Sequence, residues 1–157
     1  NGVVTIRDEV DWLRQYIFLQ QTKLKNSFDC HINVEPEIMG LSIHKLLLQP
    51  FIENAILHGF EGVEGTHRLS VDMGREETCI RICIRDNGCG MPEEMVQEIN
   101  AGVFRSTDDK NHIGMENAIT RICMYYGEKA DVQIDSRPGE GTAVLIRIPV
   151  TEDGGNV

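Results

Sequence analysis

Apolar side chains recur along this chain with two different periods, and these periods predict its helices and strands. Near the N-terminus the apolar positions lie three, four or seven residues apart, at Ile6, Val10, Leu13, Ile17 and Leu24. This spacing places them on one face of a helix. Thr5 and Asp8 are both suitable N-terminal caps for it. We therefore expect an amphipathic helix within residues 1–25.

Five later segments alternate apolar and polar residues, which is typical of strands with one buried face. They run from Phe28 to Val34, Leu69 to Met73, Ile80 to Ile84, Val132 to Ile134 and Val144 to Ile148. Pro36 ends the first strand. We expect hairpin turns at Gly74-Arg75-Glu76-Glu77 and at Arg137-Pro138-Gly139-Glu140-Gly141. Because such strands bury only one face, the pattern predicts a mixed sheet with its helices on one side.

Three further helices are expected between these strands. The first runs from about Ile43 to Leu57 and is ended by Gly59, and Pro50 fits it without a kink only near a first turn. The others run from Pro92 to near Gly102 and from about Ile113 to Tyr126, where Gly127 closes the helix.

The polar stretch Arg105–His112 has no apolar side chain to anchor it, and we expect it to be open without a ligand. The polar tail 151–157 is expected to fray. The 157 residues correspond to one domain, which we place at residues 1–150.

Composition excludes several classes of function. The longest apolar run, Ile122 to Tyr126, is far too short to cross a membrane. A net charge of −10 repels phosphate backbones and anionic membrane surfaces, so we expect no nucleic acid partner and no direct membrane contact. The five cysteines are odd in number and lack CxxC spacing, which argues against a disulfide framework and a zinc site. A reducing cytoplasm fits this pattern.

Candidate chemistry begins on the helix around Pro50. There Leu48, Ile52, Ala55 and Ile56 share an apolar stripe, while Glu53, Asn54 and His58 lie on the opposite side. An acid, an amide and an imidazole thus gather on one face. Taken alone, these three residues fit a solvated polar face better than a functional site.

Three loops add further candidates. Asp86-Asn87-Gly88-Cys89-Gly90-Met91 follows a strand, where glycines let the backbone approach a ligand and a carboxylate can accept a hydrogen bond from an amine. His112-Ile113-Gly114-Met115-Glu116-Asn117 enters a helix whose free N-terminal amides favour an anion. Gly139-Glu140-Gly141-Thr142 is the last, although a plain turn explains it equally well. Neither GxGxxG nor GxxxxGK[ST] occurs, so the sequence does not support nucleotide binding of the Rossmann or P-loop kind.

Taken in order, these four segments resemble the N, G1, G2 and G3 boxes of the GHKL ATPases, which include sensor histidine kinases, type II topoisomerases, Hsp90 and MutL proteins. The segment Leu47-Leu48-Gln49-Pro50-Phe51-Ile52-Glu53-Asn54-Ala55-Ile56-Leu57-His58-Gly59 is most similar to the LytS and YesM branch of histidine kinases. The resemblance implies an α+β fold, the two-layer α/β sandwich of the Bergerat type, with a mixed, mostly antiparallel sheet. ATP would lie between the helices and a flexible lid.

The resemblance also implies roles for individual residues. Asn54 matches the family's Mg²⁺ ligand, and Glu53 matches the acid that polarises the acceptor or a water. His58 occupies the position from which a side chain reaches the phosphates. Asp86 matches the carboxylate that accepts the adenine amino hydrogen, a contact that guanine cannot make. The base pocket would be completed by Gly88, Gly90, Gly141 and the hydroxyl of Thr142.

For the phosphates, the resemblance points to the start of the helix before Gly127. Gly114 and the amides from Met115 onward match the phosphate-binding hinge of the lid, and Asn117 matches an amide on the following helix. Many kinases have a glycine where this chain has His112, which would contact phosphate or cover the site.

The implied function is that of the catalytic domain of a two-component sensor histidine kinase, with ATP and Mg²⁺ as cofactors. None of His31, His44, His58, His67 and His112 lies in a Pro-His-Phe type acceptor motif. We therefore expect the acceptor histidine in a missing segment ahead of the helix in residues 1–25. That segment, in the same subunit or a second one, and a response regulator would be the partners. The domain would be cytoplasmic, in a membrane-bound sensor. An ATP-hydrolysing GHKL domain and a non-catalytic ATP-sensing module are the alternatives.

Overall fold

This computed structural model describes residues 2–23, 28–60, 64–103 and 110–150, with the backbone alone for 110–113. The helices are α1 (Ile6–Lys23), α2 (Gln49–Asn54), α3 (Glu93–Asn100) and α4 (Lys110–Tyr126). The strands are β1 (Val3–Thr5), β2 (Phe28–Val34), β3 (Ser42–His44), β4 (His67–Glu76), β5 (Cys79–Asp86), β6 (Asp131–Ser136) and β7 (Thr142–Pro149). Short turns of other helix types are η1 (Pro36–Ile38), η2 (Ala55–Gly59) and η3 (Gly127–Lys129), of which η2 is a π-helix.

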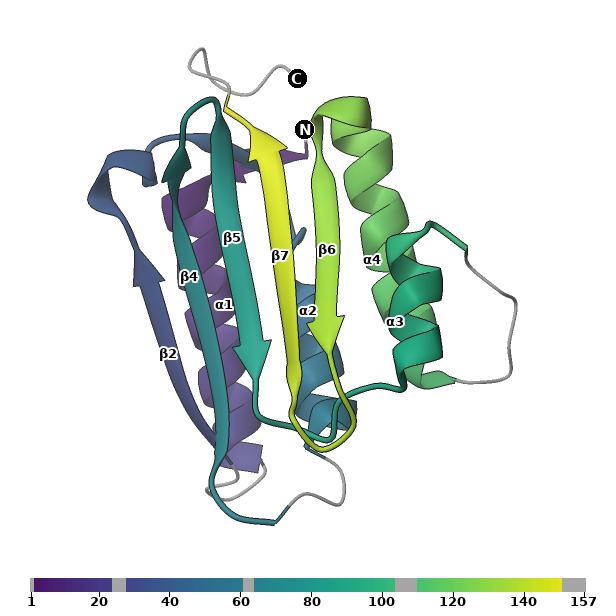
Figure 1. Cartoon of the computed structure of the whole chain (residues 1–157). Coiled ribbons are helices and arrows are strands. Elements are labelled where there is room, and N and C mark those ends of the chain that lie inside the picture. The colour runs from purple at the N-terminus through teal and green to yellow at the C-terminus, as the bar shows by residue number, and fades with distance from the viewer. Residues whose placement is uncertain (1, 24–27, 61–63, 104–109, 151–157) are drawn as a thin grey trace.

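Five of the described strands form one large sheet in the order β2-β4-β5-β7-β6. β2 runs parallel to β4, and the other neighbours are antiparallel. The helices lie on one face of this sheet, with α1 and α2 behind it in the view of Figure 1. A mixed, mostly antiparallel sheet with helices on one face is the predicted fold class, which is thereby confirmed.

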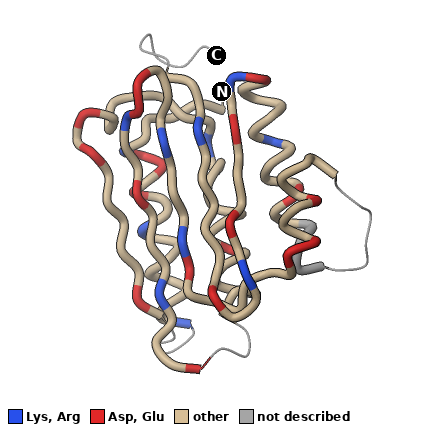
Figure 2. The backbone as a smooth tube through the Cα atoms, viewed as in Figure 1, with Lys and Arg blue, Asp and Glu red and all other residues tan. Residues whose placement is uncertain are grey.

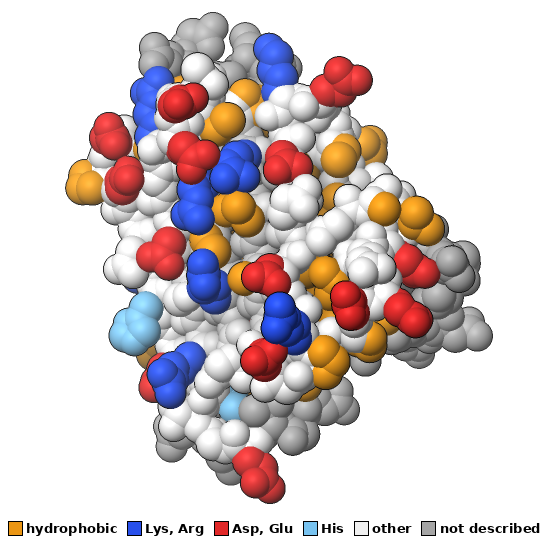
Figure 3. Space-filling model, in the orientation of Figure 1, with side chains coloured by type: hydrophobic (Ala, Val, Ile, Leu, Met, Phe, Trp, Pro, Cys, Tyr) orange, Lys and Arg blue, Asp and Glu red, His pale blue; other side chains and the backbone are white. Residues whose placement is uncertain are grey.

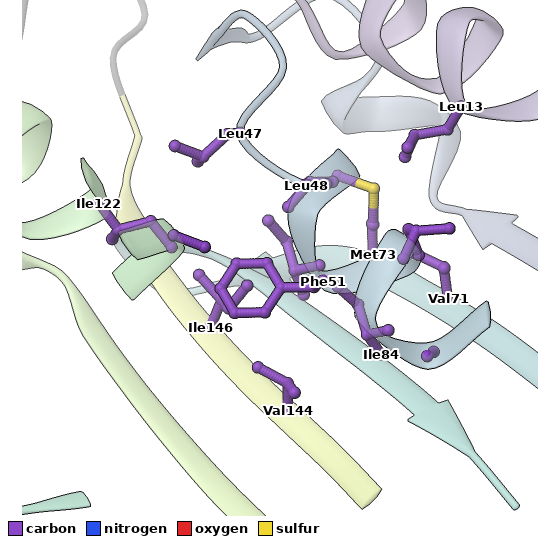
Figure 4. Close-up of a cluster of buried hydrophobic side chains, with 14 of the residues drawn as sticks. Leu13, Leu47, Leu48, Phe51, Val71, Met73, Ile84, Ile122, Val144 and Ile146 are labelled. Carbon is purple, nitrogen blue, oxygen red and sulfur yellow. The ribbon is translucent and has the colours of Figure 1, made fainter. Parts of the chain in front are cut away.

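The core lies between the helices and the inward-facing strand residues. Phe51 and Ile52 of α2 are at most 2% exposed. In Figure 4, the ring of Phe51 points toward Ile146 of β7, and Ile122 of α4 lies near the same cluster. Truncating a buried ring of this kind typically costs about 3–5 kcal/mol of stability. This packing anchors α2 against the sheet, and with it the polar side chains at the end of α2.

The other face of the sheet is open and carries charges of both signs (Figures 2 and 3). Glu76 pairs with Arg147 at 2.9 Å and with Arg81 at 3.5 Å, and Arg147 also approaches Asp131 at 3.8 Å. Such exposed pairs contribute about 0–1 kcal/mol each. These ion pairs link charges of opposite sign on β4, β5, β6 and β7.

The start of the second predicted helix is wrong. Ile43 lies in β3, which pairs with β1 in a separate two-stranded sheet, and Leu46 adopts a positive φ of 60°. The helix begins only at Gln49, so Pro50 falls in its first turn, where the missing amide costs nothing. Strands of three residues are too short to show alternation, which is why β1 and β3 were not predicted.

Two smaller differences concern strand and helix ends. β4 continues through the predicted turn to Glu76, and the hairpin turn lies at Glu77 and Thr78, where Glu77 has a φ of 56°. α4 begins at Lys110, three residues before the predicted start. Of the two suggested caps for α1, Thr5 is the one used, since its Oγ1 accepts the Asp8 amide at 3.2 Å. Most of the Arg105–His112 stretch and the tail 151–157 lie outside the described residues.

Candidate functional site

Three of the four candidate segments meet at one end of the sheet. The end of η2, the loop after β5 and the β6–β7 turn lie together at the lower end of Figure 1. The Cys89 amide donates to the Gly59 carbonyl at 2.5 Å, and the Gly139 amide donates to the Cys89 carbonyl at 2.7 Å. The loop after β5 is therefore tied to η2 on one side and to the β6–β7 turn on the other.

Asp86 occupies the last position of β5, facing the helix layer and half-buried. Its Oδ1 accepts the Gly88 amide at 2.8 Å. Burial raises the pKa of this carboxyl to about 6, and backbone hydrogen bonds from Gly88 and Thr142 offset part of that effect. The site thus holds a carboxylate that has lost much of its water and retains capacity to accept further hydrogen bonds.

Glycines surround Asp86 because the backbone leaves no room for side chains. A Cβ on Gly88 would lie 1.9 Å from the Gly59 carbonyl oxygen, and one on Gly141 would lie 2.1 Å from the Asp86 carbonyl oxygen. Gly90 has a φ of 72° and would place a Cβ 1.9 Å from the Arg137 carbonyl oxygen. At these positions any other residue would displace the loop.

Ser136 fixes the β6–β7 side of the site. It is 8% exposed, its Oγ donates to the Gly141 carbonyl at 2.8 Å, and it lies 2.9 Å from Thr142 Oγ1. The same Oγ accepts the Met91 amide at 2.9 Å. A cavity of about 330 Å³ beside this turn is lined by Asp86, Ser136 and Thr142, among others. Of the predicted pocket residues, Gly88, Gly90, Gly141 and Thr142 are therefore brought together around Asp86.

Two contributors to this site were not predicted as such. Asn87 uses its side chain to hold the start of β4, accepting the Arg68 amide at 2.6 Å and donating to the Thr66 carbonyl at 2.7 Å. Ser136 ends β6 and shows no pattern in the sequence that marks it. Asn87 lies inside the predicted glycine-rich loop, and asparagine is favoured in turns. This preference was the sequence feature that could have pointed to Asn87.

The predicted phosphate-side residues Glu53, Asn54 and His58 lie on α2 and η2. Glu53 and Asn54 are half-buried at the end of α2, and His58 is half-buried in η2. Glu53 Oε1 accepts a hydrogen bond from Gln49 Nε2 at 2.9 Å. The π-helical turn carries one more residue than an α-turn before Gly59 meets the loop after β5, and such turns are frequent at functional sites.

The segment at the start of α4 differs from the expected hinge. Gly114 is the fifth residue of α4, in the second turn, so its amide is not among the free amides of the first turn. The Met115 side chain is 1% exposed and belongs to the core, while Asn117 is exposed. The side chain of His112 lies outside the described part of the chain.

No group of three or more His, Cys, Asp or Glu side chains among the described residues is arranged to hold a metal ion. Mg²⁺ commonly takes only one or two protein oxygens and completes its shell with water and phosphate oxygens. The amide oxygen of Asn54 suits that mode. Within the described residues, no helix is long and apolar enough to pass through a membrane.

Comparison with known proteins gives a matching family model and several relatives. A family model described as histidine kinase-, DNA gyrase B-, and HSP90-like ATPase matches residues 42–152. The sensor protein kinase HptS of Staphylococcus aureus (strain USA300) is 30% identical over 156 residues. That match covers 98% of this chain and 29% of HptS, so the chain spans less than a third of this relative's length.

Solved structures share the fold at low sequence identity. The nucleotide-free catalytic domain of the histidine kinase ThkA has a TM-score of 0.64 at 14% identity, with 94% of this chain and 93% of that chain covered. The mycobacterial sensor histidine kinase MprB has a TM-score of 0.65 at 15% identity, with 94% and 96% covered. Both likenesses concern the whole arrangement of helices and sheet.

Proposed function

The chain belongs to the histidine kinase-, DNA gyrase B-, and HSP90-like ATPase family, and on this basis we propose that it is the catalytic, ATP-binding domain of a sensor histidine kinase. It transfers the γ-phosphate of Mg-ATP to a histidine outside this chain. The observation that carries the proposal is Asp86, a half-buried carboxylate at the end of β5 enclosed by backbone that only glycine permits.

Asp86 supplies the base recognition in this proposal. Its carboxylate accepts a hydrogen bond from the adenine amino group, and guanine is rejected because it presents a carbonyl there. The close approach of Gly59, whose Cβ would lie 3.3 Å from Asp86 Oδ1, confines the carboxylate to one direction. Thr142 of β7, which is paired with Asp86 of β5, adds a hydroxyl near the base.

The phosphates are assigned to the end of α2 and the start of α4. Asn54 offers an amide oxygen to Mg²⁺, which when bound neutralises phosphate charge. Glu53 polarises the acceptor histidine, and His58 approaches the phosphates from η2. The free amides of the first turn of α4 favour the terminal phosphate, as helix N-termini do for anions. Catalysis of this reaction depends mainly on positioning and on charge stabilisation.

The acceptor histidine and the response regulator are proposed as partners. HptS, which is named a sensor protein kinase, is more than three times as long as the segment matched here. The five cysteines are all free, which supports the further proposal that the domain works in the reducing cytoplasm as part of a membrane-bound sensor.

Isotope labelling tests the function directly. This chain, incubated with Mg-ATP carrying labelled γ-phosphate, is expected to remain unlabelled, and addition of an acceptor segment with a Pro-His-Phe type motif is expected to yield acid-labile, base-stable phosphate on that segment. Release of inorganic phosphate without labelling would instead identify an ATP hydrolase. Tight ATP binding with neither outcome would identify a sensing module.

A further inference from the structure

α1 contacts α2 through polar side chains as well as through the core, and this polar contact ends at Glu53. The indole Nε1–H of Trp12 donates a hydrogen bond to Gln49 Oε1 at 2.7 Å. Gln49 Nε2 in turn donates to Glu53 Oε1 at 2.9 Å. Three side chains therefore form a continuous row from α1 to the carboxylate that precedes Asn54.

The donors and acceptors of this row permit one arrangement. An indole N–H only donates, and a carboxylate only accepts. The Gln49 amide must therefore turn its oxygen toward Trp12 and its nitrogen toward Glu53. Rotating that amide by half a turn would lose both hydrogen bonds, so Trp12 fixes the orientation in which Gln49 holds Glu53.

The row leaves part of the Glu53 carboxylate available. Gln49 and Glu53 are four residues apart and so are neighbours on the surface of α2. Their hydrogen bond uses Oε1, and no described residue donates a hydrogen bond to Oε2. Glu53 also lies close to Tyr16, one turn beyond Trp12 on α1. Burial first, and the negative charge of Glu53 second, raise the pKa of Tyr16 to about 12.

A shift of α1 along its axis would break the hydrogen bond between Trp12 and Gln49. Its side chain is 49% exposed, whereas Val10 and Leu13 beside it are at most 1% exposed and hold the opposite side of α1 in the core. One residue of helix corresponds to a rise of about 1.5 Å. A shift of that size is larger than the roughly 0.5 Å range over which an N–H···O hydrogen bond keeps good geometry.

Glu9, one turn before Trp12, connects the same side of α1 to the segment before α2. Its carboxylate accepts the amides of Leu46 at 2.9 Å and Leu48 at 3.3 Å. α1 thus makes two polar contacts with the α2 region. Glu9 holds the backbone that leads into α2, and Trp12 holds the side chain of Glu53 by way of Gln49.

We infer that Trp12 and Gln49 are positioning residues for Glu53, and that displacement of α1 against α2 lowers the rate of phosphoryl transfer by releasing the Glu53 carboxylate. This inference rests on the proposed function, in which Glu53 acts on the acceptor. It identifies α1 as the element through which an input reaches the reacting groups.

Kinetics of variants in the complete protein test the inference. Trp12→Phe removes the indole donor while keeping an aromatic ring, and Gln49→Ala removes the middle of the row. Each is expected to lower kcat for phosphoryl transfer about tenfold, since misplacement by about 1 Å can cost up to a hundredfold, while the KM for ATP stays unchanged. The double variant is expected to be no slower than Gln49→Ala, because Trp12 acts through Gln49. Phe18→Leu, at a 70% exposed position outside the row, is the matched control and is expected to behave as the parent.

A separate measurement examines the row without catalysis. The chain contains a single tryptophan, so its indole N–H gives one NMR resonance. Gln49→Ala is expected to shift this resonance and to accelerate its exchange with solvent, because the hydrogen bond is lost. An unchanged resonance would show that Trp12 does not donate a hydrogen bond to Gln49, and would overturn the inference.

The outcomes distinguish the inference from the proposed function. Loss of transfer in Glu53→Ala, together with normal kcat in Trp12→Phe and Gln49→Ala, would overturn the inference and leave the function intact. Additive effects of the two variants would also overturn it. Full transfer by Glu53→Ala, or no transfer by the parent, would instead contradict the proposed function itself.

Discussion

The carbonyl oxygen of Gly59 accepts the amide of Cys89 at 2.5 Å, and this hydrogen bond joins the end of the α2–η2 helix to the loop that follows β5. Of the proposed phosphate ligands, Asn54 and His58 lie on the helix side of the bond, and the proposed adenine ligand Asp86 lies on the loop side. The two halves of one nucleotide site are therefore held together by backbone atoms, which constrains the side chains allowed around them.

Gly88→Ala is expected to abolish detectable ATP binding. The new Cβ would lie 1.9 Å from the Gly59 carbonyl oxygen and 2.7 Å from Asp86 Oδ1, so the loop would move away from η2. Titration with a fluorescent ATP analogue measures the effect. Gly40→Ala is the matched control, since a Cβ there meets nothing within 4 Å. Equal affinity in the Gly88→Ala protein and the parent would show that this contact does not hold the site.

Asp86→Asn is expected to weaken ATP binding by about 1–3 kcal/mol, because the amide can present a donor where adenine needs an acceptor. Calorimetric titration with ATP and with GTP measures both the loss of affinity and the loss of discrimination. A variant that binds ATP as tightly as the parent would rule out Asp86 as the adenine ligand.

The same substitution is expected to stabilise the free protein at neutral pH. Burial raises the pKa of Asp86 from 3.8 to about 6, so the folded protein binds this proton more tightly than the unfolded chain does. The contribution of Asp86 to the free energy of unfolding is therefore greatest below pH 3.8 and decreases as the pH rises to about 6. Denaturant unfolding across this range should show the advantage of Asp86→Asn increasing up to about pH 6 and constant above it. An advantage that shrinks with rising pH would contradict the assignment.

Asn54→Ala is expected to remove the magnesium-dependent part of ATP affinity, because alanine has no oxygen ligand. Binding measured with Mg²⁺ should fall toward the value measured with a chelator, while the magnesium-free affinity changes little. Asn33→Ala on the exposed side of β2 serves as control. An undiminished effect of Mg²⁺ in Asn54→Ala would exclude this residue as the ligand.

Glu9→Leu is expected to destabilise the fold by about 2–4 kcal/mol, since it leaves the amides of Leu46 and Leu48 without their acceptor in a buried position. Glu9→Gln keeps one acceptor oxygen and should lose less. The exposed Asp11 on the same helix provides the control, and Asp11→Leu should change stability by less than about 0.5 kcal/mol. Similar midpoints of thermal unfolding for Glu9→Leu and Asp11→Leu would refute the role of Glu9.

The sequence was sufficient for the elements whose patterns are local. The strands around Val71 and Ile82 and the helix before Gly127 follow from periodicity, because each buries one face against a common core. The helix around Pro50 was placed too early, since Ile43 and Leu47 continue its apolar spacing although Ile43 is paired in β3. Tertiary pairing therefore overrode a pattern that is ambiguous in short segments.

The candidate site was predictable only to the level of motifs. Order and spacing of the four boxes indicated which segments would meet, and the glycines around Asp86 indicated close backbone approach. The hydrogen bonds Trp12–Gln49 and Ser136–Met91 join residues that are 37 or more positions apart. In addition, no motif in the sequence distinguishes Ser136 from other serines. One sequence contains no signal that pairs such positions.

The π-helical turn at Ala55–Gly59 has a consequence for aligning this chain with its relatives. A π-turn accommodates one residue more than the α-turn it replaces. Where a relative continues as a regular α-helix, an ungapped alignment would shift His58 and Gly59 by one position, and each position on a helix corresponds to about 100° of rotation. Equivalence at these two residues is therefore better assigned by superposing Asn54 and Asp86 in space than by counting along the chain.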